Sequence, residues 1–189
     1  MSLKKDNYKS SDKKIMNFAI NLAENNKYIT GTNPSVGCVI VKNNKILSFA
    51  TTNYGGRPHA ESIALNKNRS NKGTSLYSTL EPCSHHGVTP PCTNAIIKNK
   101  VKRVYYSIED KDLRTFNKTK KILKSKKIVA ISGLQKQKVK SLYSEYNYIK
   151  SKKAPYIIGK IASSSNLNIL RNSSPITNEH SRSVSHILR

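Results

Sequence analysis

The sequence predicts an α/β protein built on a layered sheet of five strands. Short apolar runs rich in β-branched residues alternate with longer segments whose apolar residues recur at helical spacing. Between the first two runs, after Lys42, lie Asn43 and Asn44, a pair suited to a hairpin turn. Strands that alternate with helices are typical of layered α/β sheets, and the hairpin indicates an antiparallel pair at the start of this one.

The first half of the chain is expected to hold a helix, the hairpin and a second helix. A helix over Asp12–Lys27 is predicted by one apolar face, which contains Ile15, Phe18, Ala19, Leu22 and Ala23. After a turn at Asn33-Pro34, we expect strands at Val36–Val41 and Lys45–Thr52. A loop at Gly55–Pro58 then leads into a helix that begins near His59.

The second half continues the alternation and ends in a separate segment. We expect strands and helices in the order Ser75–Thr79, Thr93–Asn99 (helix), Val104–Ile108, Thr115–Ser125 (helix), Ile128–Ile131 and Gln135–Tyr148 (helix). Lys150–Ala154 has the composition of a linker, which predicts a first domain over residues 1–150 and an appendage over 151–189. The appendage offers one strand candidate, Tyr156–Ala162, and is too short for a core of its own.

The composition favours anionic partners without naming one. A formal net charge of +24 suits nucleic acid, acidic membrane or phosphorylated metabolites, although the lysines are spread along the chain as they would be on any exposed surface. The N-terminal stretch MSLKKDNYKSSDKK lacks an apolar core, and no apolar run is long enough to span a bilayer. We therefore expect a soluble protein in a reducing, cytoplasmic setting, with no membrane partner.

The three cysteines, Cys38, Cys83 and Cys92, are too few for a disulfide framework. Cys38 lies inside an apolar strand, which predicts a buried packing residue. Cys83 and Cys92 each follow a proline in polar loop sequence, where they would be exposed to oxidation unless a metal bound them. Two thiolates and one histidine make a catalytic zinc site with an open fourth position, whereas a fourth ligand from His85 or His86 would make a closed structural site.

The segment His59-Ala60-Glu61 together with Pro82-Cys83 and Pro91-Cys92 resembles the H-x-E…P-C signature of zinc-dependent nucleobase and nucleotide deaminases. Residues two apart on a helix point in roughly opposite directions, so His59 and Glu61 can share one site only at a helix end. Cys92 is also expected at a helix start, where the helix dipole favours a thiolate. Two helix N-termini that face one metal form a coherent site.

Eight residues separate Cys83 from Cys92, and this spacing narrows the resemblance. The loop E-P-C-S-H-H-G-x-T-P-P-C, the segment Asn33-Pro34-Ser35-Val36-Gly37-Cys38-Val39-Ile40-Val41 and the tetrad Pro58-His59-Ala60-Glu61 are similar to the deaminase domain of the riboflavin-biosynthesis deaminase–reductase family. They occur in the family's order over about residues 12 to 150. The resemblance implies a three-layer α/β/α cytidine-deaminase-like fold with a five-stranded mixed sheet.

The resemblance also implies a reaction and the residues for it. The family deaminates 2,5-diamino-6-ribosylamino-4(3H)-pyrimidinone 5′-phosphate to 5-amino-6-(5-phosphoribosylamino)uracil and ammonia. Carried over by position, His59, Cys83 and Cys92 would hold one Zn²⁺, and Glu61 would move protons. Asn33, Ser84 and His85 would bind the substrate, a small pyrimidine ribosyl phosphate.

Several positions depart from the family's pattern. Thr52 replaces a usual histidine, Val88 replaces a usual cation, and the segment from Asp110 to Lys118 replaces a usual D-P-N-P run. Nearby Lys111, Arg114 or Lys118 could supply phosphate contacts in their place. The tail from Ala154 resembles the start of the family's reductase domain without its nucleotide-binding body, so we expect no reductase activity and no NADPH, and a separate reductase in the pathway.

Two other functions compete with this interpretation. A nucleic-acid deaminase acting on tRNA would explain the charge, but the cysteine spacing differs from that class, and an aromatic content of 7% offers no obvious stacking platform. A decayed, non-catalytic zinc-binding protein would explain the departures. The sequence leaves the oligomeric state open, and a homo-oligomer is compatible with an open sheet edge.

Overall fold

The computed structural model describes residues 8–159 of the 189-residue chain. The chain divides into two compact units, Met1–Lys153 and Ala154–Arg189. All helices and strands of the described residues lie in the first unit. Residues 154–159 contain no helix or strand, so the predicted strand at Tyr156–Ala162 does not begin where expected, and its last three residues lie outside the described part.

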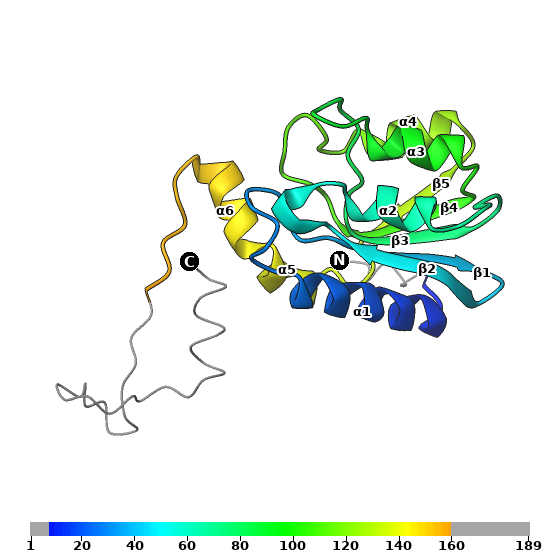
Figure 1. Cartoon of the computed structure of the whole chain (residues 1–189), viewed down its shortest axis with the longest axis horizontal. Helices are drawn as coiled ribbons and strands as arrows, with labels where there is room; N and C mark the ends of the chain where they lie inside the picture. The colour runs from blue at the N-terminus through cyan, green and yellow to red at the C-terminus, as the bar shows by residue number, and fades with distance from the viewer. Residues whose placement is uncertain (1–7, 160–189) are drawn as a thin grey trace, which may run out of the picture. The chain divides into compact units, whose positions relative to one another are not determined.

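The first unit is built on one mixed five-stranded sheet, as predicted (Figure 1). Its strands are β1 (Gly37–Lys42), β2 (Lys45–Thr51), β3 (Ser75–Leu80), β4 (Arg103–Ile108) and β5 (Val129–Ser132). Their order is β2-β1-β3-β4-β5, with β1 antiparallel to both of its neighbours and the β3–β4 and β4–β5 pairs parallel. The parallel half requires crossover helices, which place helix starts at the carboxyl ends of strands.

The β1–β2 hairpin confirms the predicted Asn-Asn turn. Asn43 and Asn44 have φ values of 50° and 60°, a left-handed conformation that asparagine adopts more readily than most residues. Lys42 therefore pairs with Lys45 across a two-residue loop. Cys38 lies in β1 with none of its surface exposed, as expected of a packing residue.

Helices cover both faces of the sheet (Figure 1). Helix α1 (Ser10–Asn25) packs on β1 and β3, with α5 (Val139–Leu142) beside it. On the other face lie α2 (Ala60–Asn66), α3 (Cys92–Lys98) and α4 (Thr119–Ser125). A single-turn 3₁₀ helix, η1 (Tyr54–Gly56), precedes α2, and α6 (Ser144–Lys152) follows α5. The predicted three-layer α/β/α arrangement is confirmed.

Two predicted helices differ from the observed ones. The helix expected from Thr115 begins only at Thr119, because residues 115–118 form turns anchored to the loop after β3. The helix expected over Gln135–Tyr148 is two helices that meet at Tyr143. Tyr143 is buried, and its hydroxyl bonds the Thr79 hydroxyl at 2.6 Å and donates to the Ser35 carbonyl at 3.0 Å. These tertiary bonds fix the break, and α6 continues through part of the predicted linker to Lys152.

Candidate metal centre and pocket

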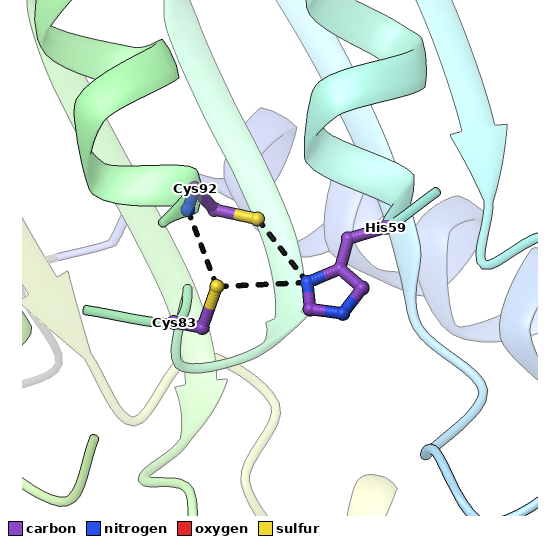
Figure 2. A group of neighbouring side chains, drawn as sticks. All are labelled: His59, Cys83 and Cys92. Carbon is purple, nitrogen blue, oxygen red and sulfur yellow. Dashed lines mark hydrogen bonds between the residues drawn. The ribbon is translucent and has the colours of Figure 1, made fainter. Parts of the chain in front are cut away.

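Three candidate metal ligands meet at the carboxyl edge of the sheet. His59 is the residue that caps the start of α2, Cys92 is the first residue of α3, and Cys83 lies in the loop that follows β3. Figure 2 shows the imidazole of His59 pointing toward both sulfur atoms from the start of its helix. The sequence argument that His59 must stand at a helix end agrees with this placement.

The distances between these side chains suit a tetrahedral zinc ion. His59 Nδ1 lies 3.5 Å from Cys83 Sγ and 3.4 Å from Cys92 Sγ, and all three ligand atoms lie within 4.8 Å of one another. Zinc bonds of about 2.3 Å to sulfur and about 2.0 Å to nitrogen at a tetrahedral angle place S and N about 3.5 Å apart. The group therefore fits one zinc ion, with Nδ1 as the nitrogen that faces it.

Neither of the neighbouring histidines joins this group. His85 Nδ1 bonds the Thr115 hydroxyl at 2.9 Å, and the exposed His86 bonds the Gly87 carbonyl at 3.0 Å. Among residues 8–159, His59, Cys83 and Cys92 are the one cluster that meets the geometry for a metal. A closed four-ligand site that used His85 or His86 is thus not what the structure presents.

The two thiols have opposite acidities before a metal binds. Hydrogen bonds from the Cys92 thiol, from His59 and from the Cys92 N–H, which lies 3.2 Å from the sulfur, lower the pKa of Cys83 to about 4. The same Cys83 contact, together with burial, raises the pKa of Cys92 well above its usual value. Hydrogen bonding to Cys83 also raises the pKa of His59. These contacts favour a thiolate at Cys83 and a thiol at Cys92, whose proton metal binding would displace.

Glu61 follows His59 by two residues and is buried in the first turn of α2. Its Oε1 accepts a hydrogen bond from the Ser78 hydroxyl at 3.1 Å, and its Oε2 accepts one from the Cys92 thiol at 3.6 Å. Burial raises the pKa of this carboxyl group above its ordinary value. A buried carboxyl group with a raised pKa beside a metal group has the properties of a proton carrier.

A pocket of about 560 Å³, including its open mouth, lies beside His59, Glu61 and Cys83. It is lined by Asn33, Pro34, Val36, Thr52, Arg57, His59, Glu61, Leu80, Glu81, Cys83, His85, Asp110, Asp112, Arg114, Tyr146 and Lys150. The lining contains four acidic side chains, three basic ones and the amide of Asn33. Such a pocket suits a polar ligand that offers both hydrogen-bond donors and acceptors.

Of the predicted substrate-binding residues, Asn33 and His85 line the pocket and Ser84 does not. Asn33 Nδ2 donates to the Gly56 carbonyl at 3.4 Å. Gly56 has φ 88°, and a Cβ there would lie 2.4 Å from Asn33 Nδ2, so glycine is required at this contact. The Ser84 hydroxyl is buried without a hydrogen-bond partner among the described residues, while its backbone N–H approaches the Thr115 hydroxyl at 3.5 Å.

The positions that depart from the family's pattern have different surroundings. Thr52 lines the pocket and is buried, and its hydroxyl accepts from the Val36 N–H at 2.9 Å and donates to the Pro34 carbonyl at 3.2 Å. Val88 is 84% exposed and is not among the lining residues. The next residue, Thr89, accepts a hydrogen bond from Arg57 at 2.8 Å. The position of Val88 therefore lies close to a guanidinium from another element.

Glu81 organises one wall of the pocket, a role that the sequence analysis missed. Its buried carboxylate accepts the backbone N–H groups of Asp110, Asn117 and Thr119, each at 3.2 Å. Burial raises the pKa of Glu81, and these three N–H groups offset part of that rise. The held segment carries Asp110, Asp112 and Arg114 into the pocket and Thr115 to the side chain of His85.

Helix α6 supplies another part of the pocket wall, a role that the sequence did not predict for its residues. The Tyr146 hydroxyl donates to Asp110 Oδ1 at 2.9 Å, and Lys150 bonds Asp112 at 3.2 Å. Arg114 also pairs with Asp112, at 2.5 Å. Of the three cations suggested for phosphate contacts, Arg114 lines this pocket, whereas Lys111 lies over the Phe116 ring in another pocket and Lys118 precedes α4.

Within residues 8–159, no helix combines the length and the apolar character that crossing a bilayer requires.

The chain matches a known family over much of its length. The model of the family described as the cytidine and deoxycytidylate deaminase zinc-binding region matches residues 9–108. The riboflavin biosynthesis protein RibD of Aquifex aeolicus is 38% identical over 94% of this chain and 51% of its own length. The diaminohydroxyphosphoribosylamino-pyrimidine deaminase of Buchnera aphidicola is 41% identical over 65% of this chain and 84% of its own length.

The chain is also similar to solved structures of proteins with these names. One crystal form of Acinetobacter baumannii RibD is similar with a TM-score of 0.80 and 35% identity, covering 93% of this chain and 51% of that one. A Thermotoga maritima protein described as a diaminohydroxyphosphoribosylaminopyrimidine deaminase and 5-amino-6-(5-phosphoribosylamino)uracil reductase matches with a TM-score of 0.72 and 35% identity, over 77% of this chain and 43% of that one. The chain thus spans about half the length of several relatives that it matches.

Proposed function

The chain belongs to the cytidine and deoxycytidylate deaminase zinc-binding family, in the branch of the riboflavin-biosynthesis deaminases, and from this premise we propose its reaction. We propose that it hydrolyses the exocyclic amino group of 2,5-diamino-6-ribosylamino-4(3H)-pyrimidinone 5′-phosphate. Water adds to ring carbon C2, which bears the 2-amino group. The bond between C2 and that nitrogen then breaks, and 5-amino-6-(5-phosphoribosylamino)uracil and ammonia are formed. The observation that carries the proposal is the buried Glu61 carboxyl group beside the His59–Cys83–Cys92 group in one pocket.

His59, Cys83 and Cys92 would hold one zinc ion, which when bound supplies a Lewis acid that lowers the pKa of a water molecule. Glu61 takes the proton that the water loses and delivers protons to the ring nitrogen and to the departing amine. Its raised pKa suits both directions of transfer, because a carboxyl group of ordinary acidity would hold a proton too weakly near neutral pH. The Ser78 hydroxyl fixes the orientation of the carboxylate through Oε1.

The pocket residues would select and orient the pyrimidine. The Asn33 amide, held against the Gly56 carbonyl, offers a donor and an acceptor to the ring edge. His85 also lines the pocket, where Thr115 fixes its ring through Nδ1. Self-association of the chain is also part of the proposal.

The test is ammonia release from the diaminopyrimidine phosphate by purified, zinc-loaded protein. We expect turnover by the wild type, and a loss of about 10²- to 10⁴-fold in kcat for Glu61→Gln with an unchanged zinc content. Glu24→Gln is the matched control, because Glu24 is an exposed glutamate on α1. A wild-type protein with a full zinc site and no turnover would sink the proposal.

A further inference from the structure

The cationic groups of the pocket are Arg57, Arg114 and Lys150, and they differ in how far they are already neutralised. Arg114 and Lys150 both pair with Asp112, at 2.5 and 3.2 Å. The hydrogen bonds from Arg114 hold the pKa of Asp112 well below its usual range, so this carboxylate stays charged at physiological pH. Two of the three cations therefore already have an anion within the chain.

Arg57 has no carboxylate partner among residues 8–159. Its Nη1 donates to the Thr89 hydroxyl at 2.8 Å, and its Nη2 lies against Gly87, 3.6 Å from where a Cβ would stand on that glycine. A guanidinium group carries five N–H donors in a fixed plane, so most of its donors remain available toward the pocket. The loop between Cys83 and Cys92 thus holds the guanidinium in place without neutralising it.

A second donor lies beside Arg57. Its Nη1 is 3.4 Å from His59 Nε2, the ring nitrogen on the far side from the two sulfur atoms. If Nδ1 holds a zinc ion, a neutral imidazole would carry its proton on Nε2, and two N–H donors would then face each other. Histidines that bind metals ordinarily give this N–H to an oxygen acceptor, and the described residues supply none here. An oxygen atom of a ligand could accept hydrogen bonds from both Arg57 Nη1 and His59 Nε2.

We propose that Arg57 is a specificity-determining residue that binds the phosphate group of the substrate. A guanidinium group matches the oxygens of a phosphate monoester in charge and in planar, two-pronged geometry. Arg57 is the pocket cation that has no carboxylate partner within residues 8–159, and it lies beside the ring nitrogen of His59 that faces away from the two sulfur atoms. This inference rests on the proposed function, because that function supplies the phosphorylated substrate.

The first experiment compares kcat/KM for the diaminopyrimidine phosphate and for its dephosphorylated form. We expect Arg57→Met to lose about 10- to 100-fold on the phosphorylated compound, chiefly through KM, and to lose much less on the dephosphorylated compound, so that the preference for the phosphate falls. Arg57→Lys should keep part of the preference, because it retains the charge without the two-pronged geometry. Lys111→Met is the matched control, since it removes a positive charge from a different pocket.

The second experiment measures binding of ribose 5-phosphate to zinc-loaded wild type and Arg57→Met at fixed ionic strength, with the zinc content of each. We expect about tenfold weaker binding by the variant and equal zinc. Equal binding by both proteins, no binding by the wild type, or loss of zinc from the variant would each overturn the assignment of Arg57 to phosphate.

The two arms separate the inference from the function it rests on. If the wild type turns over neither pyrimidine, the proposed function fails, and the ribose 5-phosphate measurement still decides the role of Arg57. If the wild type prefers the phosphorylated pyrimidine and Arg57→Met keeps that preference, the function stands and the inference fails. Arg57→Gln replaces Arg57→Met in both arms should the methionine variant not fold.

Discussion

Replacing Glu81 by glutamine tests whether one buried carboxylate holds the pocket wall. In the structure, Oε2 accepts the N–H groups of Asp110 and Asn117, and Oε1 accepts that of Thr119. A glutamine has one oxygen and one NH₂ group in the same space. If its oxygen faces Asp110 and Asn117, its NH₂ group faces the Thr119 N–H, and a buried donor loses its acceptor.

The size of the effect follows from these contacts. A buried N–H left without an acceptor costs about 1 to 3 kcal/mol, and a hydrogen bond to a neutral oxygen is about half as strong as one to a carboxylate. Because Glu81 is only 2% exposed, water cannot replace the lost acceptor. We therefore expect Glu81→Gln to lower the free energy of unfolding by about 2 to 4 kcal/mol.

The assay is urea unfolding followed by circular dichroism, with zinc at the same saturating concentration throughout. Glu24→Gln, on the exposed side of α1, should stay within about 0.5 kcal/mol of the wild type. A Glu81→Gln variant as stable as Glu24→Gln would refute the reasoning. The segment that Glu81 holds contains Thr115, which fixes His85. We therefore expect Glu81→Gln to raise the KM for the substrate as well.

Three further predictions concern packing, pH and metal. Gly37→Ala should destabilise the fold by about 1 to 3 kcal/mol in urea unfolding, because its Cβ would lie 1.9 Å from the Ala19 carbonyl oxygen; unchanged stability would contradict this contact. Arg114 lowers the pKa of Asp112, so Asp112 contributes stability above about pH 4 that is lost as the pH falls through the lowered pKa; the gap between wild type and Asp112→Asn should narrow in acid, and a constant gap would argue against it. Removal of zinc by a chelator should lower Tm, with recovery on adding zinc but not magnesium, and an unaltered Tm would count against the metal centre.

Local patterns in the sequence were sufficient for much of the fold. The apolar face of α1, the run of β1 and the Asn43-Asn44 turn each depend on neighbouring residues, and all three occur close to the predicted positions. The metal group was also predictable, because the constraint that His59 and Glu61 share a helix end is itself local. The helix, the strand and the turn are each fixed by residues only a few positions apart, whereas the metal group joins His59 to cysteines 24 and 33 positions along the chain.

The remaining features depend on contacts between distant residues. The break at Tyr143 is fixed by hydrogen bonds to Thr79 and Ser35, and neither partner can be inferred from the helical spacing around Tyr143. Glu81 looks like an ordinary loop residue until the turns after β4 fold over it. Arg57 and Lys150 were missed for a related reason, since a chain rich in basic residues gives no sign of which positive charges face inward, whereas Arg114 was among the candidates.

The contribution of α6 to the pocket separates metal binding from substrate binding along the chain. A fragment that stopped at residue 143 would keep all five strands and every candidate metal ligand, and by those criteria it would pass for a whole deaminase unit. It would nevertheless lack Tyr146 and Lys150, so Asp110 and Asp112 would each lose one of their side-chain partners. Expression of this unit should therefore include residues through Lys153, because a shorter product could hold zinc and still bind substrate poorly.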